Sequence, residues 1–322
     1  MPFSMRTPAL HWAAIVLLTA ATCGPTLAAP PEGPVIMTED VTRFYRIYDS
    51  LGAHPTAYQL DHSYIDQGSE GLRQFAKLRK ISGATIVEAI KKRPEIYADA
   101  RRCLTALPAV KRRLTAVFGK LAQVYPEANF AAPVTIVVGR GKPIGITNPA
   151  GVSIGLEALC ATNLMHPNVE DRFVHTIAHE YGHIQQPRAD ETDHPGATVL
   201  FASLIEGGAE FTAELISGDV SAYQLKSLTK GQEAAIETAF IEDQDKTDLS
   251  KWLYNGPGTA EHPGDLGYWV GYRIVKSYYR HAPDKHQALC DIFEMKDPKA
   301  FLAKSGWRPA ASQQSSAPHG SR

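Results

Sequence analysis

Residues 174–187 read VHTIAHEYGHIQQP and contain an H-E-x-x-H pattern formed by His179, Glu180 and His183. Residues four apart lie on the same face of an α-helix, so the two imidazoles can bind one metal ion. Glu180 then points to the side where a water on a zinc ion would lie. The residues before the motif are apolar on the neighbouring face, as in a buried helix. We therefore predict a buried helix over residues 169–186 that carries a zinc site.

A third zinc ligand must come from another part of the chain, because a catalytic zinc site usually has three protein ligands. Residues 198–217, TVLFASLIEGGAEFTAELIS, predict a second and largely apolar helix. A carboxylate that faces inward from such a helix needs a partner, because burying it unpaired is costly. Glu206 is the preferred candidate, and Glu210 and Glu214 remain alternative third ligands.

The pattern around these two segments predicts an α+β fold that is predominantly helical. Residues 134–138 (VTIVV) and 152–156 (VSIGL) predict two strands, separated by a Gly- and Pro-rich loop over residues 139–151. We expect a small sheet before the H-E-x-x-H helix and a helical C-terminal lobe on the other side of a cleft. The remaining helices are predicted over residues 38–50, 71–80, 85–92, 94–107, 110–125, 224–246, 266–281, 285–295 and 297–304.

The N-terminus has the pattern of a secretory signal peptide. Arg6 supplies the positive charge, and residues 9–22 form an apolar segment that is too short to span a bilayer comfortably. We predict a periplasmic or secreted protein with no stable membrane span after cleavage, and an uncleaved anchor is the alternative. An oxidising compartment permits one disulfide and one free thiol, in a pairing left open, among Cys103, Cys160 and Cys290.

The composition is typical of a globular protein, with 44% hydrophobic and 21% charged residues. A net charge of -1 gives no reason to expect nucleic acid or an anionic membrane as a partner. The oligomeric state and a pro-segment role for the N-terminal region stay open. The predicted organisation is a signal peptide (1–29), an N-terminal helical region (30–128), a core that carries the site (129–308) and a disordered tail (309–322).

The two helices together resemble the gluzincin metallopeptidases, which include thermolysin-like enzymes. The resemblance rests on H-E-x-x-H followed by the E-G-x-A segment that starts at Glu206. Over residues 45–307 the chain also resembles a bacterial family of predicted zinc-dependent proteases, with a VVG strand and a late G-Y-x-x-G-Y segment. The resemblance implies a zincin-like core in which Glu206 is the third zinc ligand. It also implies that Glu210 hydrogen bonds to the first zinc histidine, His179.

The activity that the resemblance implies is hydrolysis of peptide or protein substrates by a zinc-activated water, with Glu180 as general base. A further donor would stabilise the developing oxyanion. We select Tyr268 for this role, and Tyr272 and His262 remain alternatives. The resemblance also places an extended substrate along residues 152–156, as an added strand at the sheet edge.

Two other functions compete with a zinc metallopeptidase. One is a non-catalytic envelope protein that binds a partner on the same scaffold, and the other is a zinc hydrolase of a non-peptide substrate. The presence of Glu180 favours catalysis, because a purely structural zinc site gains nothing from a base that does not bind the metal. The substrate and the choice between endopeptidase and exopeptidase action are not predicted.

Overall fold

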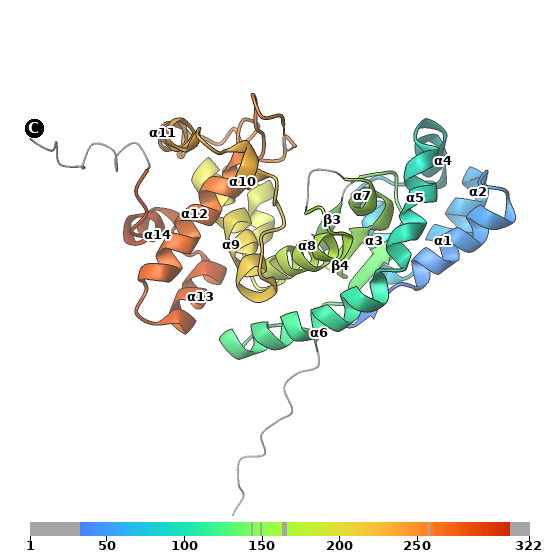
Figure 1. The fold of residues 1–322 in the computed structure, drawn as a ribbon, viewed down its shortest axis with the longest axis horizontal. Coiled ribbons are helices and arrows are strands. Elements are labelled where there is room, and N and C mark those ends of the chain that lie inside the picture. Colours follow the sequence, from blue (N-terminus) through green and yellow to red (C-terminus); the bar gives the residue numbers. More distant parts are fainter. Residues whose placement is uncertain (1–32, 143, 149, 163–165, 257, 310–322) are drawn as a thin grey trace, which may run out of the picture.

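The structure is a computed structural model, and it describes residues 33–142, 144–148, 150–162, 166–256 and 258–309. The fold is α+β and predominantly helical, as the sequence predicted. A small sheet lies among the helices (Figure 1). The predicted signal peptide and residues 310–322 of the predicted tail lie outside the described residues.

The N-terminal part of the chain is helical, and its predicted helices are confirmed to within a few residues. The side chains of Ser69 and Ser82 cap two of these helices by accepting the N–H of the third residue that follows. A π-helix and two short elements near it were not predicted. The elements are β1 (Ile36–Met37), α1 (Glu39–Ser50), α2 (Ala57–Gln59), η1 (Leu60–Ile65), α3 (Glu70–Leu78), α4 (Gly83–Lys92), α5 (Pro94–Leu104) and α6 (Leu107–Val124).

The sheet has four strands in the order β1-β2-β4-β3. β2 (Val134–Val137) is parallel to both β1 and β4 (Gly151–Gly155). β3 (Gly145–Asn148) is antiparallel to β4 and has no second strand beside it among the described residues. The free edge on this side of the sheet is therefore β3.

Two predictions about this region were wrong. Residues 139–151 are not a loop throughout, because they contain β3. The predicted edge strand over residues 152–156 corresponds to β4, which lies inside the sheet between β2 and β3. The sequence G-I-T-N is too short and polar to be recognised as a strand, and β3 forms because pairing with β4 satisfies its backbone groups.

The C-terminal part is again helical and begins directly after β4. The helices predicted around residues 169–186, 198–217 and 266–281 are confirmed, and α7 was not predicted. The elements are α7 (Leu156–Ala161), α8 (Val169–Ile184), the 3₁₀ helix η2 (Ala189–Asp193), α9 (Val199–Ser217), α10 (Leu225–Leu228), α11 (Glu233–Asp243), α12 (Leu266–His281), α13 (Lys285–Glu294) and α14 (Pro298–Lys304).

The hydrophobic core has two parts, which meet where α8 packs against α9 (Figure 1). The first part joins α1–α6 and the sheet to the apolar face of α8, including Phe118 and Phe173. The second part joins α9 to the later helices, including Trp252 and Phe293. The two metal-ligand helices predicted from the sequence therefore lie at the junction of the two parts.

Small residues let the central helices approach closely. A Cβ atom on Gly182 of α8 would lie 3.0 Å from the Cα of Ala209 on α9. On the other side of α9, a Cβ on Gly271 of α12 would lie 1.7 Å from the carbonyl oxygen of Ser203. Larger residues at these two glycines would push α8 or α12 away from α9.

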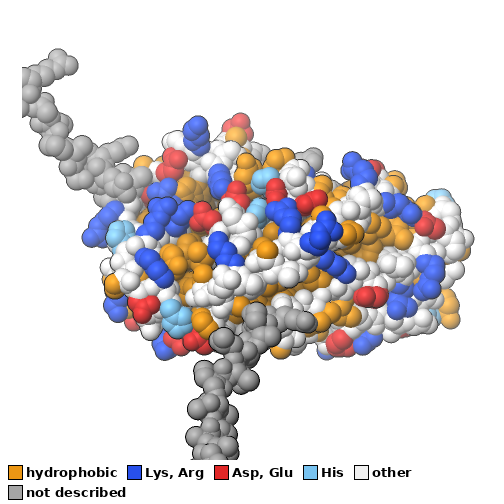
Figure 2. All heavy atoms as spheres, turned by 60° about the horizontal axis from the view of Figure 1, so that its bottom comes forward, with side chains coloured by type: hydrophobic (Ala, Val, Ile, Leu, Met, Phe, Trp, Pro, Cys, Tyr) orange, Lys and Arg blue, Asp and Glu red, His pale blue; other side chains and the backbone are white. Residues whose placement is uncertain are grey.

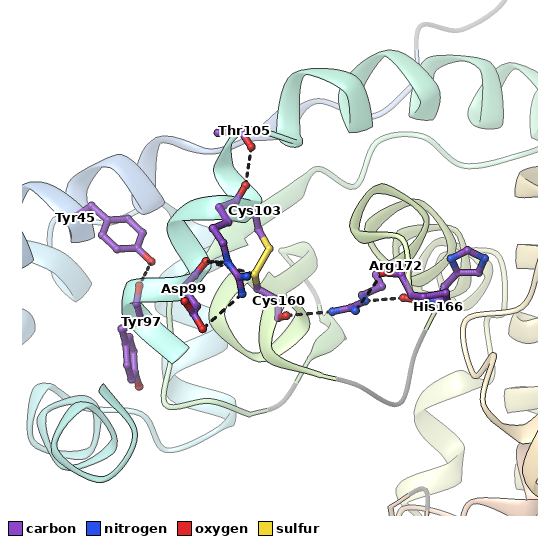
Figure 3. Close-up of a disulfide and its surroundings, with 10 residues drawn as sticks. Tyr45, Tyr97, Asp99, Cys103, Thr105, Cys160, His166 and Arg172 are labelled. Atoms are coloured by element: carbon purple, nitrogen blue, oxygen red, sulfur yellow. Dashed lines mark hydrogen bonds and ion pairs between the residues drawn. A yellow bond between two sulfur atoms is a disulfide. The ribbon is translucent and has the colours of Figure 1, made fainter. Parts of the chain in front are cut away.

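A disulfide joins Cys103 to Cys160 and leaves Cys290 as a free thiol (Figure 3). It ties the end of α5 to α7, two elements that are 57 residues apart in the chain. This settles the pairing that the sequence left open. The count of one disulfide and one free cysteine agrees with the prediction for the described residues.

The surface has no strong segregation of charge on the face that Figure 2 shows, where acidic and basic side chains are interspersed. Within the described residues, no helix combines the length and the apolar character needed to cross a bilayer.

Candidate metal centre

α8 presents His179 and His183 to α9 because its opposite face is anchored in the first part of the core. The side chain of Asn168 caps the helix by accepting the N–H of Asp171. Phe173 and Ile177 are fully buried on the anchored face. Both imidazoles are also largely buried, with 9% and 12% of their side-chain surface exposed.

α9 supplies two carboxylates to the same place. Thr198 caps its N-terminus, and nearly every residue of the helix is buried. Glu206 and Glu210 are one turn apart, so both side chains face α8. Glu214 lies a further turn away and forms an ion pair with Lys276, at 2.7 Å between Oε1 and Nζ.

Three potential ligand atoms converge between the helices. The Nε2 atoms of His179 and His183 are 3.2 Å apart. Oε2 of Glu206 lies 3.4 Å from the first of these atoms and 3.2 Å from the second. Ligands held about 2.0–2.1 Å from a tetrahedral ion are roughly 3.3 Å from one another. The spacing of the three atoms therefore fits a single zinc ion.

The chemistry of this group also fits a cation. Oε2 of Glu206 is buried and accepts no hydrogen bond of good geometry from any residue that the structure describes. A buried carboxylate oxygen in that state is costly without a cation. The two imidazoles and this carboxylate form the one group with metal-ligand spacing found among the described residues.

The ionisation of the group reflects burial opposed by neighbouring charge. Burial disfavours the protonated form of His179, but the carboxylates of Glu210 and Glu206 outweigh it and raise the pKa of His179. Glu206 raises the pKa of His183 in the same way. Burial acts to raise the pKa of Glu206, but the two histidines outweigh it and lower that pKa. A metal ion entering the group therefore displaces protons.

Each histidine has a partner on the ring nitrogen that faces away from the group. Nδ1 of His179 lies 3.1 Å from Oε1 of Glu210, which is an ion-pair distance, but the two atoms do not form the hydrogen bond of good geometry that the resemblance implied. Nδ1 of His183 lies 2.8 Å from Oε1 of Gln186. Gln186 donates from Nε2 to the carbonyl oxygen of Ile205, so its oxygen must face the imidazole. His183 therefore carries its proton on Nδ1 and leaves Nε2 free for a metal.

The comparison with known families agrees with this geometry. Residues 151–296 match the family described as Predicted Zn-dependent protease (DUF2268). The match to this zinc protease family runs from β4 to just beyond α13 and includes all three potential ligands and Glu180. No curated protein and no solved structure gave a significant match.

Glu180 lies beside the group without belonging to it, and β3 holds it there. Oγ1 of Thr147 donates to Oε2 of Glu180 at 3.0 Å and lies 2.9 Å from the backbone carbonyl oxygen of Glu180. A Cβ on Gly145 would lie 2.6 Å from Oε1 of Glu180. The family match begins at the strand after β3, so Gly145 and Thr147 lie outside the matched segment, whereas Glu180 lies inside it.

Tyr268 of α12 lies against the metal group. Its ring is 6.2 Å from the ring of His179 and nearly parallel to it. Burial, reinforced by the negative charge of Glu206, raises the pKa of Tyr268 well above its usual value. The hydroxyl therefore stays protonated and can act as a hydrogen-bond donor.

Tyr254 is a second tyrosine at the group, and sequence reasoning missed it. Its side chain is 53% exposed, yet its hydroxyl interacts with Glu206 and Thr192. Burial of the hydroxyl and the charge of Glu206 raise its pKa. Tyr254 stands in an irregular Gly- and Pro-rich stretch with a positive φ of 61°, where no periodicity marks a side chain as inward-facing.

The two alternative donors, and two titratable residues near the H-E-x-x-H motif, have different surroundings. The hydroxyl of Tyr272 accepts a hydrogen bond from Nζ of Lys276, which lies one turn further along α12, at 2.7 Å. His262 is exposed on the loop before α12. His175 is a buried helix residue whose Nδ1 lies 2.8 Å from Oγ of Ser217. In the loop after α8, Glu191 pairs with Arg188.

A large open cavity lies at this same loop. It has a volume of about 980 Å³. Most of the residues from 188 to 201 line one side of it, and Asp297–Lys299 at the N-terminus of α14 also line it. His179, His183 and Glu206 are not part of its lining.

Proposed function

We propose that this chain is an exported zinc metallopeptidase that hydrolyses peptide bonds. In this proposal His179, His183 and Glu206 hold the zinc ion, and Glu180 is the general base. The observation that carries the proposal is the spacing of three ligand atoms 3.2–3.4 Å apart beside a carboxylate that is not one of them. The match to a family of predicted zinc-dependent proteases supports it.

The chemistry divides between the metal and the chain. Zinc, when bound, is a Lewis acid that lowers the pKa of a bound water and polarises a carbonyl group. Glu180 takes a proton from the attacking water at a carboxylate oxygen and passes it to the nitrogen of the leaving amine. Thr147 orients Glu180 through the hydrogen bond to Oε2. Water adds to the carbonyl carbon, the C–N bond breaks, and an acid and an amine are released.

Tyr268 is the proposed donor to the oxygen of the scissile carbonyl. Its protonated hydroxyl and its position against His179 support this role. Tyr254 is a second candidate donor, because its hydroxyl lies at Glu206 and its pKa is also raised. Replacing each tyrosine by Phe separates them, since the true donor lowers kcat and leaves zinc content unchanged.

Export is the other part of the proposal. The disulfide between Cys103 and Cys160 supports it, because such bonds persist in oxidising compartments and are rare in the cytosol. Mass spectrometry of the protein recovered from the native host checks the prediction, since cleavage near residue 29 gives a shortened chain. A chain that retains residues 1–29 on the membrane would favour the uncleaved anchor.

Glu180→Gln tests the catalytic role. This change keeps the size and polarity of the side chain but removes the base, so hydrolysis of a casein-derived peptide mixture should fall at least about 100-fold. Zinc content should stay the same as in the wild type. A wild type that binds zinc and peptides without cleaving them would favour the binding-protein function, and cleavage of esters alone would favour a non-peptide hydrolase.

Glu206→Ala tests the ligand set, with Glu214→Gln as the matched control on the same helix. We expect near-stoichiometric zinc in the wild type and the control, and a clear loss in Glu206→Ala, measured by elemental analysis after dialysis against a weak chelator. Glu214 pairs with Lys276 rather than with the histidines, so its change should not affect zinc. Equal zinc in all three proteins would contradict the role of Glu206.

A further inference from the structure

Basic side chains gather where three segments of the chain meet, next to the end of β2. The segments are the end of α3, the junction of α4 and α5, and the connection from β2 to β3. Nη2 of Arg140 donates to the carbonyl oxygen of Arg79 at 3.2 Å, and the guanidinium of Arg93 lies over Gly141, where a Cβ would collide with it. Six residues make up this basic patch: Arg79, Lys80, Lys91, Arg93, Arg140 and Lys142.

The six cations have no anionic partner. None of them forms an ion pair with any residue that the structure describes, whereas Lys92 beside them pairs with Glu88. Five are exposed and Arg140 is half-buried, with its Nε buried and donating to none of the described residues. Glu95 is a single exposed carboxylate close to Arg93 in the sequence, so the excess of charge stays positive. In a chain with a net charge of -1, this excess is a local feature that attracts anions.

The backbone that carries the patch is ordered. Oε1 of the fully buried Glu157 accepts the N–H groups of Gly139 and Gly141, on either side of Arg140. Lys80 has a positive φ of 50°, the left-handed conformation that favours glycine at the end of a helix. A lysine costs free energy in this conformation, and its charge is what glycine would not supply. An ordered backbone under the cations lowers the entropy cost of binding a ligand.

The patch lies within reach of the proposed general base, because its third segment continues into β3. Gly145 of β3 packs against the carboxylate of Glu180. Lys142 and Arg140 are three and five residues earlier, so their Cα atoms lie at most about 11 and 18 Å from that of Gly145. An extended peptide covers the same distances in about three to five residues. A peptide bond held beside Glu180 would thus have the patch at that distance, and on one side only, because the patch lies at one end of β3.

We infer that the basic patch binds the carboxylates of an acidic segment of the peptide substrate, about three to five residues to one side of the scissile bond. The inference rests on the proposed peptidase function, and it adds the class of substrate: peptides with Asp or Glu clustered on that side. The guanidinium groups in the patch match the geometry of a carboxylate. A lipid surface fits less well, because Leu78 is a single exposed apolar residue beside the patch, and stable membrane binding also requires buried apolar area.

The test compares peptides that differ only in charge. A peptide that the full zinc-loaded protein cleaves is made with Glu or with Gln at the third to fifth residues on either side of the cleaved bond. On one side we expect kcat/KM of the wild type to be about five- to tenfold higher for Glu, through KM rather than kcat, because exposed ion pairs contribute modestly and act away from the reacting atoms. About 0.5 M NaCl should remove most of the difference, since salt screens exposed charges.

The triple change Arg79→Gln, Lys80→Gln and Lys142→Gln should bring the ratio of kcat/KM for the Glu and Gln peptides close to one at low salt. All three side chains are exposed, so the variant should fold, and its Tm checks this. An unchanged ratio in this variant, or equal cleavage of the two peptides by the wild type, would overturn the inference.

The matched control is the triple change Lys120→Gln, Lys230→Gln and Lys304→Gln. These lysines are also exposed and form no ion pair with a described residue, and they lie on α6, after α10 and on α14. Because the net charge changes by the same amount, the control should keep the wild-type ratio. An equal fall in both triple variants would mean that net charge alone attracts the acidic peptide, which would contradict a role of the patch.

The two proposals can fail separately, because binding needs no cleavage. If the wild type cleaves neither peptide, the peptidase function fails, and fluorescence anisotropy with the same peptides, labelled, tests the patch. Tighter binding of the Glu peptide by the wild type and the control than by the patch variant would support the inference. Equal binding of the Glu and Gln peptides would overturn it, and patch-dependent sedimentation with phosphatidylglycerol vesicles would then assign the patch to a lipid surface.

Discussion

Gln186 gives His183 a neutral partner, whereas Glu210 gives His179 a charged one. The amide is buried and held by the carbonyl oxygen of Ile205, so it cannot rotate without losing a hydrogen bond. Gly208 makes room for it, since a Cβ there would lie 2.7 Å from Nε2 of Gln186. Gln186 is therefore placed to position His183 for a metal.

Substitution of Gln186 should change zinc affinity according to which of its two hydrogen bonds is lost. Gln186→Leu loses both and should weaken zinc binding about 10- to 100-fold. Gln186→Glu keeps the acceptor that faces His183 and loses the donor to Ile205, so it should keep most of the affinity. Competition with a chromophoric chelator measures both. Equal losses in the two variants would mean that Gln186 only ties α8 to α9.

The site residues that could be predicted from the sequence are those whose geometry is local. His179, Glu180 and His183 are related by one helical turn, and Glu206 was identified because it is a carboxylate in an apolar helix. Gln186 and Tyr254 could not be predicted in the same way. Their roles depend on partners in α9 that only tertiary packing brings near.

At the scale of elements, β3 is the part that sequence patterns missed and that holds Glu180, the proposed general base. The hydroxyl of Thr147 in β3 hydrogen bonds to the carboxylate of Glu180, and the backbone of Gly145 packs against the same carboxylate. Most of the long helices were predicted well because their apolar periodicity is long and their caps are recognisable, but residues 224–246 form two short helices, α10 and α11, instead of the one predicted. β3 was not predicted, because its four residues are mostly small or polar and show no alternation of apolar and polar side chains.

Gly145→Ala should lower activity more than stability. The added Cβ would meet Oε1 of Glu180 at 2.6 Å, and a flexible carboxylate can move aside at little cost. The displaced base should lower kcat at least about tenfold, with zinc content and Tm nearly unchanged. Gly119→Ala on α6 is the control, because a Cβ there meets no atom within 4 Å. It should keep full activity, and a similar loss in both variants would contradict this account.

The disulfide should contribute to the stability of the first part of the core. A disulfide that closes a loop of 57 residues lowers the entropy of the unfolded chain, and this effect stabilises the folded protein by about 4 kcal/mol. The double change Cys103→Ala and Cys160→Ala should therefore lower the free energy of unfolding by a few kcal/mol in urea titrations. Cys290→Ala should have a smaller effect, because this cysteine is not in the disulfide. Equal stability of the two variants would contradict the prediction.

At the scale of the whole molecule, the metal group joins the two parts of the core. α8 is anchored in the first part and α9 mainly in the second, and the three ligand atoms lie between them. A bound ion therefore acts as a link across the junction. Its binding energy adds to the stability of the folded chain as a whole, because the unfolded chain has no such site.

Removal of zinc should consequently lower the Tm of the whole protein. With free zinc at 1,000 times Kd, the linkage amounts to roughly 4 kcal/mol. Differential scanning calorimetry with and without a strong chelator measures the shift. Glu206→Ala should show almost no response to the chelator, because it lacks one of the three ligands. A chelator effect of equal size in that variant would point to a metal site elsewhere.

The segment that matches the protease family, residues 151–296, should not be a self-sufficient folding unit in this protein. Cut out at those borders, β4 would lose its pairing with β2, and α8 would lose the helical cover over Phe173 and Ile177. Phe301 and Trp307, which complete the second part of the core, would also be missing. Such a fragment would expose a strand edge and a broad apolar face, and it should aggregate. The helices before the matched segment are thus structural partners of the metal site, and a recombinant form intended for assay should begin before β1.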